Sequence, residues 1–147
     1  MIRIEGFDGS VTYRAEKLRA LGGQDVSVER DPARLQAGWA WVRDVQAMHG
    51  QPGDIWRLSC KPSDAPGLVA KAGAAQVLYD WGGGLVWLRL PGGTDLRTRL
   101  GVFDGHATCL RGGFPRFHPE PAPVAALSQG VRSKFDPKGI LNPGLMP

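Results

Sequence analysis

Two arginines and one histidine have side chains that could bind and act on a small anionic molecule. Arg57, Arg89 and His106 each occur in a short segment that alternates apolar and polar residues. A guanidinium group holds a carboxylate or a phosphate through two parallel hydrogen bonds. An unperturbed imidazole titrates near neutral pH and can accept a proton during a reaction. These residue types make Arg57 and Arg89 candidates for binding an anion and His106 a candidate base.

Simpler interpretations of the same residues remain open. The chain carries 18 basic and 14 acidic residues, and its net charge of +4 is scattered without a basic run. Arginine outnumbers lysine 13 to 5, which suits an anionic small molecule, a cofactor phosphate or an acidic partner. Any single arginine can nevertheless be a solvated surface residue. His106 can equally be a histidine at a strand end, bonded to the backbone.

Metal and disulfide chemistry are not expected. The three histidines show no HxH or HxxxH spacing, and Cys60 and Cys109 form no CxxC pair. We expect no metal site, and two unpaired thiols fit the reducing cytosol. His49 and His118 fall in predicted loops, where we expect them at the surface. No apolar run reaches a membrane-spanning length, and the first residues do not resemble a signal peptide.

The middle of the chain predicts an α+β fold with a ferredoxin-like antiparallel sheet. Ser63 is a candidate cap for the first helix, and Gly73 ends it. The expected order is β-α-β-β-α-β, a pattern that places both helices on one face of the sheet. The predicted strands cover residues 55–60, 76–81, 85–90 and 106–111, and the predicted helices cover 63–72 and 95–102.

A β-α-β-α block is expected before this core. Residues 2–4 and 26–28 alternate like short strands, and a helix between them ends at Gly22-Gly23. Asp31-Pro32 begins the second helix with a capping carboxylate and a proline in the first turn. We expect this block to extend the same sheet.

A last helix and a shaped tail are expected after the core. The helix over 123–135 ends at Asp136-Pro137, because proline moves the preceding residue out of the helical region. Asn142-Pro143-Gly144 then predicts a tight turn. We expect one domain over 1–147, with its core at about 54–111 and the helix and tail at about 121–147.

Strand alternation predicts that the two faces of the sheet differ. The aliphatic set, which includes Val86 and Leu88, should face the helices. The other face should lack a helix and should meet another molecule. It should carry Arg57, Ser59, Trp87 and Arg89, together with Tyr79.

Two binding modules share this plan. RNA-recognition modules stack bases on such a sheet, but segment 85–90 lacks their two outward aromatic residues. A free-standing small-molecule module would need a glycine-rich ligand loop. Gly82-Gly83-Gly84 joins two antiparallel strands and does not begin a helix, which favours a hairpin turn over a phosphate site. The sequence favours neither module, but the fold suits both. A ferredoxin-like RNA- or small-molecule-binding module is the alternative interpretation.

Three segments resemble, in order, the FAD-linked oxidases of the vanillyl-alcohol-oxidase type. They are most similar to the smaller flavin subunits of bacterial glycolate oxidases. The matching segments are Trp56-Arg57-Leu58-Ser59 with Pro62, Gly105-His106-Ala107-Thr108, and the tail over residues 135–144.

The resemblance implies a carboxy-terminal cap domain that covers a flavin and oxidises a 2-hydroxy acid such as glycolate. Arg57, Arg89 and Trp87 would then bind substrate, and His106 would be the catalytic base. Asn142 would lie nearest the flavin domain. Larger oxidases of this type have a histidine-rich metal motif near the position of His106, and this sequence lacks it.

The resemblance also implies that FAD is held mainly by a domain that this chain does not contain, since few residues precede the first helix. We therefore expect the 147 residues alone to bind no FAD tightly and to be inactive. The implied partners are that FAD-binding domain and the larger flavin and iron–sulfur subunits of a glycolate oxidase complex. Nucleic acid and a direct membrane span are not expected. The expected location is the cytoplasm, peripheral to the inner membrane through the complex.

Overall fold

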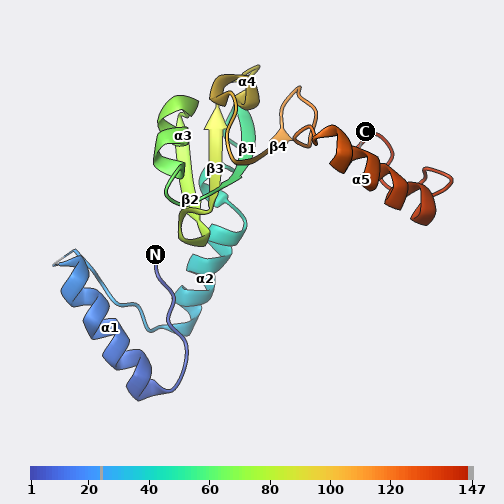
Figure 1. Ribbon diagram of the computed structural model, residues 1–147. Coiled ribbons are helices and arrows are strands. Elements are labelled where there is room, and N and C mark those ends of the chain that lie inside the picture. Colours follow the sequence, from blue (N-terminus) through green and yellow to red (C-terminus); the bar gives the residue numbers. More distant parts are fainter. Residues whose placement is uncertain (24, 146–147) are drawn as a thin grey trace. The chain divides into compact units, whose positions relative to one another are not determined.

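The protein is described by a computed structural model that covers residues 1–23 and 25–145. The chain separates into two compact units, residues 1–46 and the part that begins at Ala47 (Figure 1). Each unit is considered by itself below.

The first unit consists of helices α1 (Asp8–Gly22) and α2 (Pro32–Arg43). The predicted start of α2 is confirmed, since the Asp31 carboxylate accepts a 2.9 Å hydrogen bond from the Arg34 N–H. The predicted strands at 2–4 and 26–28 are wrong, because neither segment has strand structure. A three-residue alternation forms a strand only where a neighbour pairs with it, and neither segment adds to the sheet.

The second unit confirms the ferredoxin-like fold. Its four strands form one antiparallel sheet in the order β2-β3-β1-β4, with α3 and α4 as the connecting helices (Figure 1). Short 3-10 turns occupy Gln46–Met48 and Trp81–Gly83, the second joining β2 to β3. The elements are β1 (Asp54–Cys60), α3 (Ala65–Ala72), β2 (Gln76–Asp80), β3 (Leu85–Leu90), α4 (Leu96–Leu100) and β4 (Gly105–Arg111).

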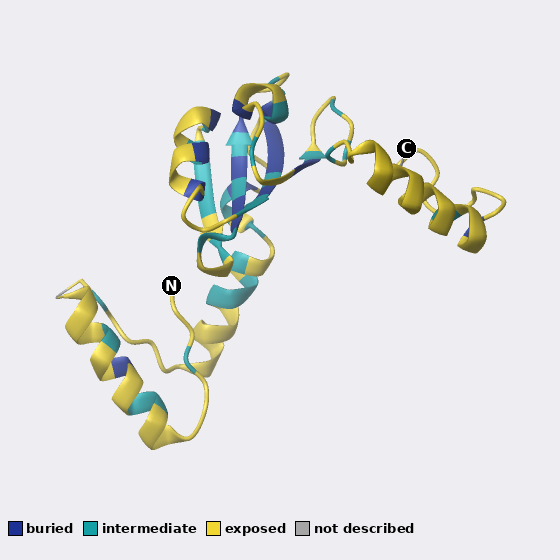
Figure 2. Ribbon diagram, viewed as in Figure 1, coloured by how far each residue is buried: buried dark blue, intermediate teal, exposed yellow. Residues whose placement is uncertain are grey.

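The hydrophobic core lies between the sheet and these two helices. Trp56, Leu58, Val86 and Leu88 are fully buried and project from β1 and β3 into one cluster with residues of α3 and α4. Figure 2 shows the burial concentrated in the sheet and on the inner sides of α3 and α4. The predicted assignment of the aliphatic set to the helix side is therefore confirmed.

Helix α3 ends as predicted but begins differently. Gly73 is left-handed, with φ 57° and ψ 41°, and caps the carboxyl end. The N-cap residue is Asp64 rather than Ser63, and the Ser63 hydroxyl donates to the Asp64 carboxylate instead. Helix α4 is shorter than the predicted 95–102, and its N-cap is Asp95, whose carboxylate accepts a hydrogen bond from the Arg97 N–H.

The outer edge of β4 is covered by the segment that follows it. The Cys109 N–H donates to the Arg116 carbonyl at 2.8 Å, and the Ala107 N–H donates to His118 Nδ1 at 3.2 Å. Arg97 of α4 holds the same segment, because its guanidinium donates to the carbonyls of Ala107, Pro115 and Arg116. These bonds satisfy backbone groups that an edge strand would otherwise leave open.

Helix α5 (Ala122–Phe135) and the tail follow the sequence prediction. The helix ends at Asp136, whose carboxylate accepts hydrogen bonds from the N–H groups of Ile140 and Leu141. Both bonds lower the pKa of Asp136, and the bond from Leu141 has the larger effect. The Leu145 N–H donates to the Asn142 carbonyl, which closes the predicted turn. No helix among the described residues combines the length and apolar character needed to cross a membrane.

Candidate functional site

The strand register brings four of the predicted site residues, Arg57, Arg89, Trp87 and His106, onto one face of the sheet. Arg57 of β1 is directly opposite Trp87 on β3 and Thr108 on β4. Ser59, two residues further along β1, is opposite His106. Directly opposed residues project to the same side, so all of these side chains share the side turned away from α3 and α4. We call this side the second face.

One end of the second face is covered by residues 51–53 of the same chain. Arg89 donates to the Pro52 carbonyl at 3.1 Å and to the Gln76 side-chain oxygen at 3.2 Å. Arg111, opposite Ile55, donates to the carbonyls of Gly53 and Gln51. The expectation of a face without any cover is therefore wrong at this end, and Thr108 and Leu85 further along the same face are buried as well. Arg89 is engaged by its own chain, which weakens its predicted role as a carboxylate clamp.

Arg57 differs from Arg89 in having no partner. It is half-buried, and it forms no hydrogen bond or ion pair with any described residue. Beside it, Trp87 is also half-buried, and its Nε1 atom is buried without a hydrogen-bond acceptor. A polar donor removed from water without a partner is energetically costly. A half-buried arginine without a partner is suited to bind an anion.

His106 is exposed at the other end of the second face. Its side chain forms no hydrogen bond with the described residues, so the alternative of a histidine bonded to the backbone finds no support. Two rungs of the sheet, Arg57 with Trp87 and Ser59 with His106, therefore place a cation, an aromatic N–H donor and an imidazole in succession. This order suits a small molecule that carries an anionic group at one end.

The structure corrects two placements made from the sequence. His118 is half-buried, accepts a hydrogen bond from Ala107 and packs edge-on against the Phe103 ring at 5.6 Å. Burial is the main cause that lowers the pKa of His118. Electrostatic interaction with Arg97 and His106 lowers this pKa further. Tyr79 pairs with Val86 and so lies on the helix side rather than on the second face. Leu78, opposite Trp87, is the β2 residue of the second face at that position.

Thr108 and Leu78 were missed because neither stands out by chemical type. Thr108 is buried beside Arg57, on the second face. The alternation of Ala107, Thr108 and Cys109 could have identified it, since Ala107 and Cys109 belong to the core on the helix side. The parity of β2 was harder to assign, because all three of its central residues have apolar or aromatic side chains.

Asn142 belongs to a second feature, a groove beside α5. This groove has a volume of about 550 Å³. Asn142 has a left-handed backbone with φ 48°, and no residue of α5 is buried. The groove is mainly apolar and is lined by Leu127, Val131, Phe135 and Leu141 together with polar neighbours that include Asn142.

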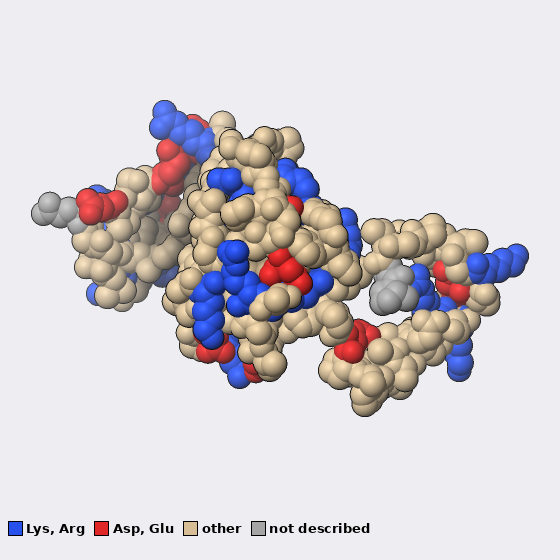
Figure 3. Space-filling model, turned by 90° about the horizontal axis from the view of Figure 1, so that it is seen from above, with Lys and Arg blue, Asp and Glu red and all other residues tan. Residues whose placement is uncertain are grey.

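Charge on the molecular surface is mixed. Figure 3 shows Lys and Arg side chains interspersed with Asp and Glu on the side that it presents, with no continuous basic strip there. Among the described residues, no group of three or more His, Cys, Asp or Glu side chains is placed to hold a metal ion.

Comparison with known proteins supports the resemblance inferred from the sequence. The chain is 35% identical to the glycolate oxidase subunit GlcE of Escherichia coli (strain K12) over 147 residues. The alignment covers 99% of this chain, which spans about 38% of the length of that relative. No protein-family model and no solved structure matches the chain.

Proposed function

We propose that this chain is the carboxy-terminal cap domain of an FAD-linked oxidase subunit of the glycolate oxidase type. In this proposal the second face of the sheet lies over the flavin and the substrate. The similarity to a glycolate oxidase subunit supports the class of protein. The observation that carries the proposal is the half-buried Arg57 without a partner, next to the buried and unsatisfied Nε1 of Trp87.

These residues fit the chemistry of a 2-hydroxy acid such as glycolate. Arg57 would bind the substrate carboxylate through two parallel hydrogen bonds, with Trp87 beside it on the same face. His106 would accept the hydroxyl proton on an imidazole nitrogen as the hydride leaves the neighbouring carbon. FAD, when bound, supplies the acceptor for that hydride. Leu78 and Trp87 would form an apolar wall that keeps water from the reacting carbon.

In this proposal the cofactor's phosphates are bound outside the described residues. Gly82, Gly83 and Gly84 form the turn from β2 to β3 and do not begin a helix, so they make no phosphate cradle. The chain would therefore contribute side chains to the substrate side of the flavin, and another domain would hold the nucleotide.

The groove beside α5 would pack against that flavin-binding domain. A 14-residue helix without a single buried residue gains little stability from its own propensity and needs a tertiary partner. Leu127 and Phe135 are 73% and 81% exposed, which gives the helix apolar surface to bury. Asn142 would lie at this contact. The larger flavin and iron–sulfur subunits of a glycolate oxidase complex at the cytoplasmic side of the membrane would be further partners.

Turnover of glycolate by the complete flavoprotein tests the role of Arg57. In the Arg57→Ala variant we expect kcat/KM to fall by about 10- to 100-fold, since charged hydrogen bonds contribute roughly 1.5–3 kcal/mol each. Folding should be nearly unchanged, because Arg57 has no partner to lose. The matched control is Arg99→Ala, which removes an exposed arginine of α4 on the opposite side of the sheet. Equal kcat/KM values for Arg57→Ala and wild type would remove Arg57 from the site.

A further inference from the structure

The two edges of the sheet are treated differently by the chain. The edge at β4 is covered by residues 114–118, as described above. The edge at β2 has no such cover among the described residues. An open edge of this kind is a template for pairing with another strand unless lysine, proline or a bulge blocks it. The β2 sequence, Gln76–Asp80, contains none of these, and its ladder with β3 has no register shift.

The outward groups of β2 can be identified from the hydrogen-bond alternation. The Cys60 N–H donates to the Gly84 carbonyl, so even-numbered residues of the β3 segment point their backbone groups toward β1. The odd-numbered residues of β3 then point their backbone N–H and C=O groups toward β2. The hydrogen bond from the Ala75 N–H to the Arg89 carbonyl agrees with this assignment. The β2 partners of these odd residues are Gln76, Leu78 and Asp80. The N–H and C=O groups of Val77 and Tyr79 are consequently directed away from the sheet and have no partner among the described residues.

This edge is complementary to itself. If two copies of β2 run antiparallel with Leu78 on a twofold axis, Val77 of one copy is opposite Tyr79 of the other. Their outward N–H and C=O groups then form the hydrogen-bonded pairs of a regular ladder. Their side chains form a β-branched–aromatic pair, which stabilises sheets.

The flanking polar residues match in the same register. Gln76 of one copy is opposite Asp80 of the other. The Gln76 side-chain oxygen is used by Arg89, which leaves its amide N–H groups free to donate. One Asp80 carboxylate oxygen accepts from the Trp81 N–H, which leaves the second oxygen free to accept. No like charges face each other along the strand.

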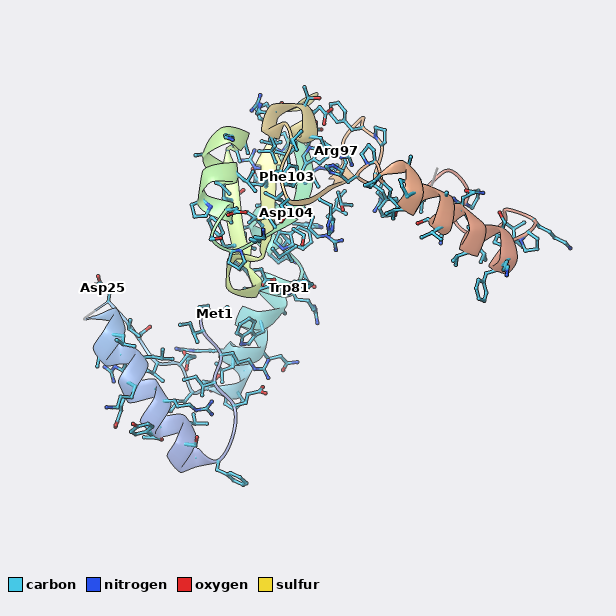
Figure 4. All side chains as sticks on the ribbon, in the orientation of Figure 1. Met1, Asp25, Trp81, Arg97, Phe103 and Asp104 are labelled. Atoms are coloured by element: carbon cyan, nitrogen blue, oxygen red, sulfur yellow. The ribbon has the colours of Figure 1, made fainter. Side chains whose placement is uncertain are left out.

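We propose that β2 is the contact edge of a twofold dimer, in which two copies of this chain join their sheets into one continuous sheet. Tyr79 and Trp81 are 46% and 74% exposed and would add aromatic contact area next to the paired strands. Figure 4 shows Trp81 at the turn that follows β2. A twofold axis through Leu78 gives the self-matching interface that such symmetry requires. This inference is independent of the catalytic proposal.

Disulfide trapping tests the register directly. In the Leu78→Cys variant of the complete flavoprotein, the two introduced thiols face each other across the axis. They occupy a non-hydrogen-bonded pair, whose Cα separation of about 4.5 Å allows a disulfide. We expect most of the protein to migrate as a covalent dimer under mild oxidation. Gln76→Cys is the control, because position 76 is opposite position 80 rather than itself. Equal cross-linking of both variants, or none of either, would overturn the proposal.

Sedimentation of the Tyr79→Pro variant tests the hydrogen bonds. Proline keeps the β2–β3 ladder but removes the outward N–H, and with it two bonds across the axis, together with the aromatic ring. We expect the wild type to sediment as a dimer and the dimer Kd to rise at least about tenfold in Tyr79→Pro. Tyr79→Ala removes the ring but keeps the N–H group, so its dimer Kd should rise less than that of Tyr79→Pro. A monomeric wild type, or a Tyr79→Pro dimer as tight as the wild type, would contradict the proposal.

Discussion

Arg97 should contribute more to the stability of the sheet than any other arginine of α4. Its guanidinium donates to the Ala107, Pro115 and Arg116 carbonyls at 2.9–3.0 Å and lies 4.9 Å from the centre of the Trp56 ring. Burial lowers the pKa of Arg97, because removal from water disfavours the charged guanidinium. Figure 4 shows Arg97 beside the segment that covers β4.

The expected cost of Arg97→Lys follows from these contacts. A lysine ammonium keeps the charge but cannot reproduce the planar fork, so about two of the three hydrogen bonds are lost. Each charged bond contributes roughly 1.5–3 kcal/mol, and partial exposure favours the lower limit. We expect the free energy of unfolding to fall by about 3 kcal/mol. The matching decrease in Tm is about 10 °C or more for a unit of this size.

Urea denaturation followed by tryptophan fluorescence measures this change, since Trp56 lies in contact with Arg97. Amide hydrogen exchange at Ala107 and Cys109 adds a local measure, because both N–H groups bond to the segment that Arg97 holds. Arg99→Lys is the control. Arg99 is exposed and makes one bond to the Ala72 carbonyl, so its loss should cost about 0.5 kcal/mol or less. Equal costs for the two variants would refute this account of Arg97.

Three further results are expected. Gly105→Ala should lower the free energy of unfolding by at least about 2 kcal/mol in thermal unfolding, because φ at Gly105 is +150° and a Cβ would collide with the Ser59 carbonyl oxygen. Gly113→Ala is the control and should be tolerated, since a Cβ at Gly113 meets no atom within 4 Å. The lowered pKa of His118 means that the folded state binds fewer protons, so stability should decrease as pH falls below about 6.5. His118→Asn can still accept a hydrogen bond from the Ala107 N–H but does not titrate, so it should weaken the dependence of the free energy of unfolding on pH. An unchanged pH dependence would show that another group titrates. Fluorescence titration of the 147-residue chain with FAD should show no tight binding, and micromolar affinity would place the cofactor site within these residues.

The ferredoxin-like core could be predicted because its signals are local. Each strand from β1 to β4 alternates or is continuously apolar, and Gly73 and Asp95 mark helix ends by their backbone and side-chain chemistry. The strand order then follows from the β-α-β-β-α-β pattern. The start of α2 was predictable for the same reason, since Asp31 and Pro32 define an N-terminus within two residues.

The errors arise where structure depends on contacts between distant residues. Residues 2–4 and 26–28 have strand-like composition, but a strand needs a neighbour, and no local pattern supplies one. Arg89 could not be distinguished from Arg57 by sequence, because the difference lies in a bond to a carbonyl 37 residues away. His118 was expected at the surface because its bond to Ala107 depends on how the following segment returns along β4.

The position of Arg57 beside a bound flavin is the central claim, and ligand binding to the flavoprotein tests it most directly. A carboxylate that cannot be oxidised, such as oxalate, should perturb the flavin absorbance of the wild type in a saturable way. In Arg57→Ala its Kd should rise at least about tenfold, while Arg99→Ala should match the wild type. An Arg57→Ala protein that binds oxalate with the wild-type Kd would contradict the claim.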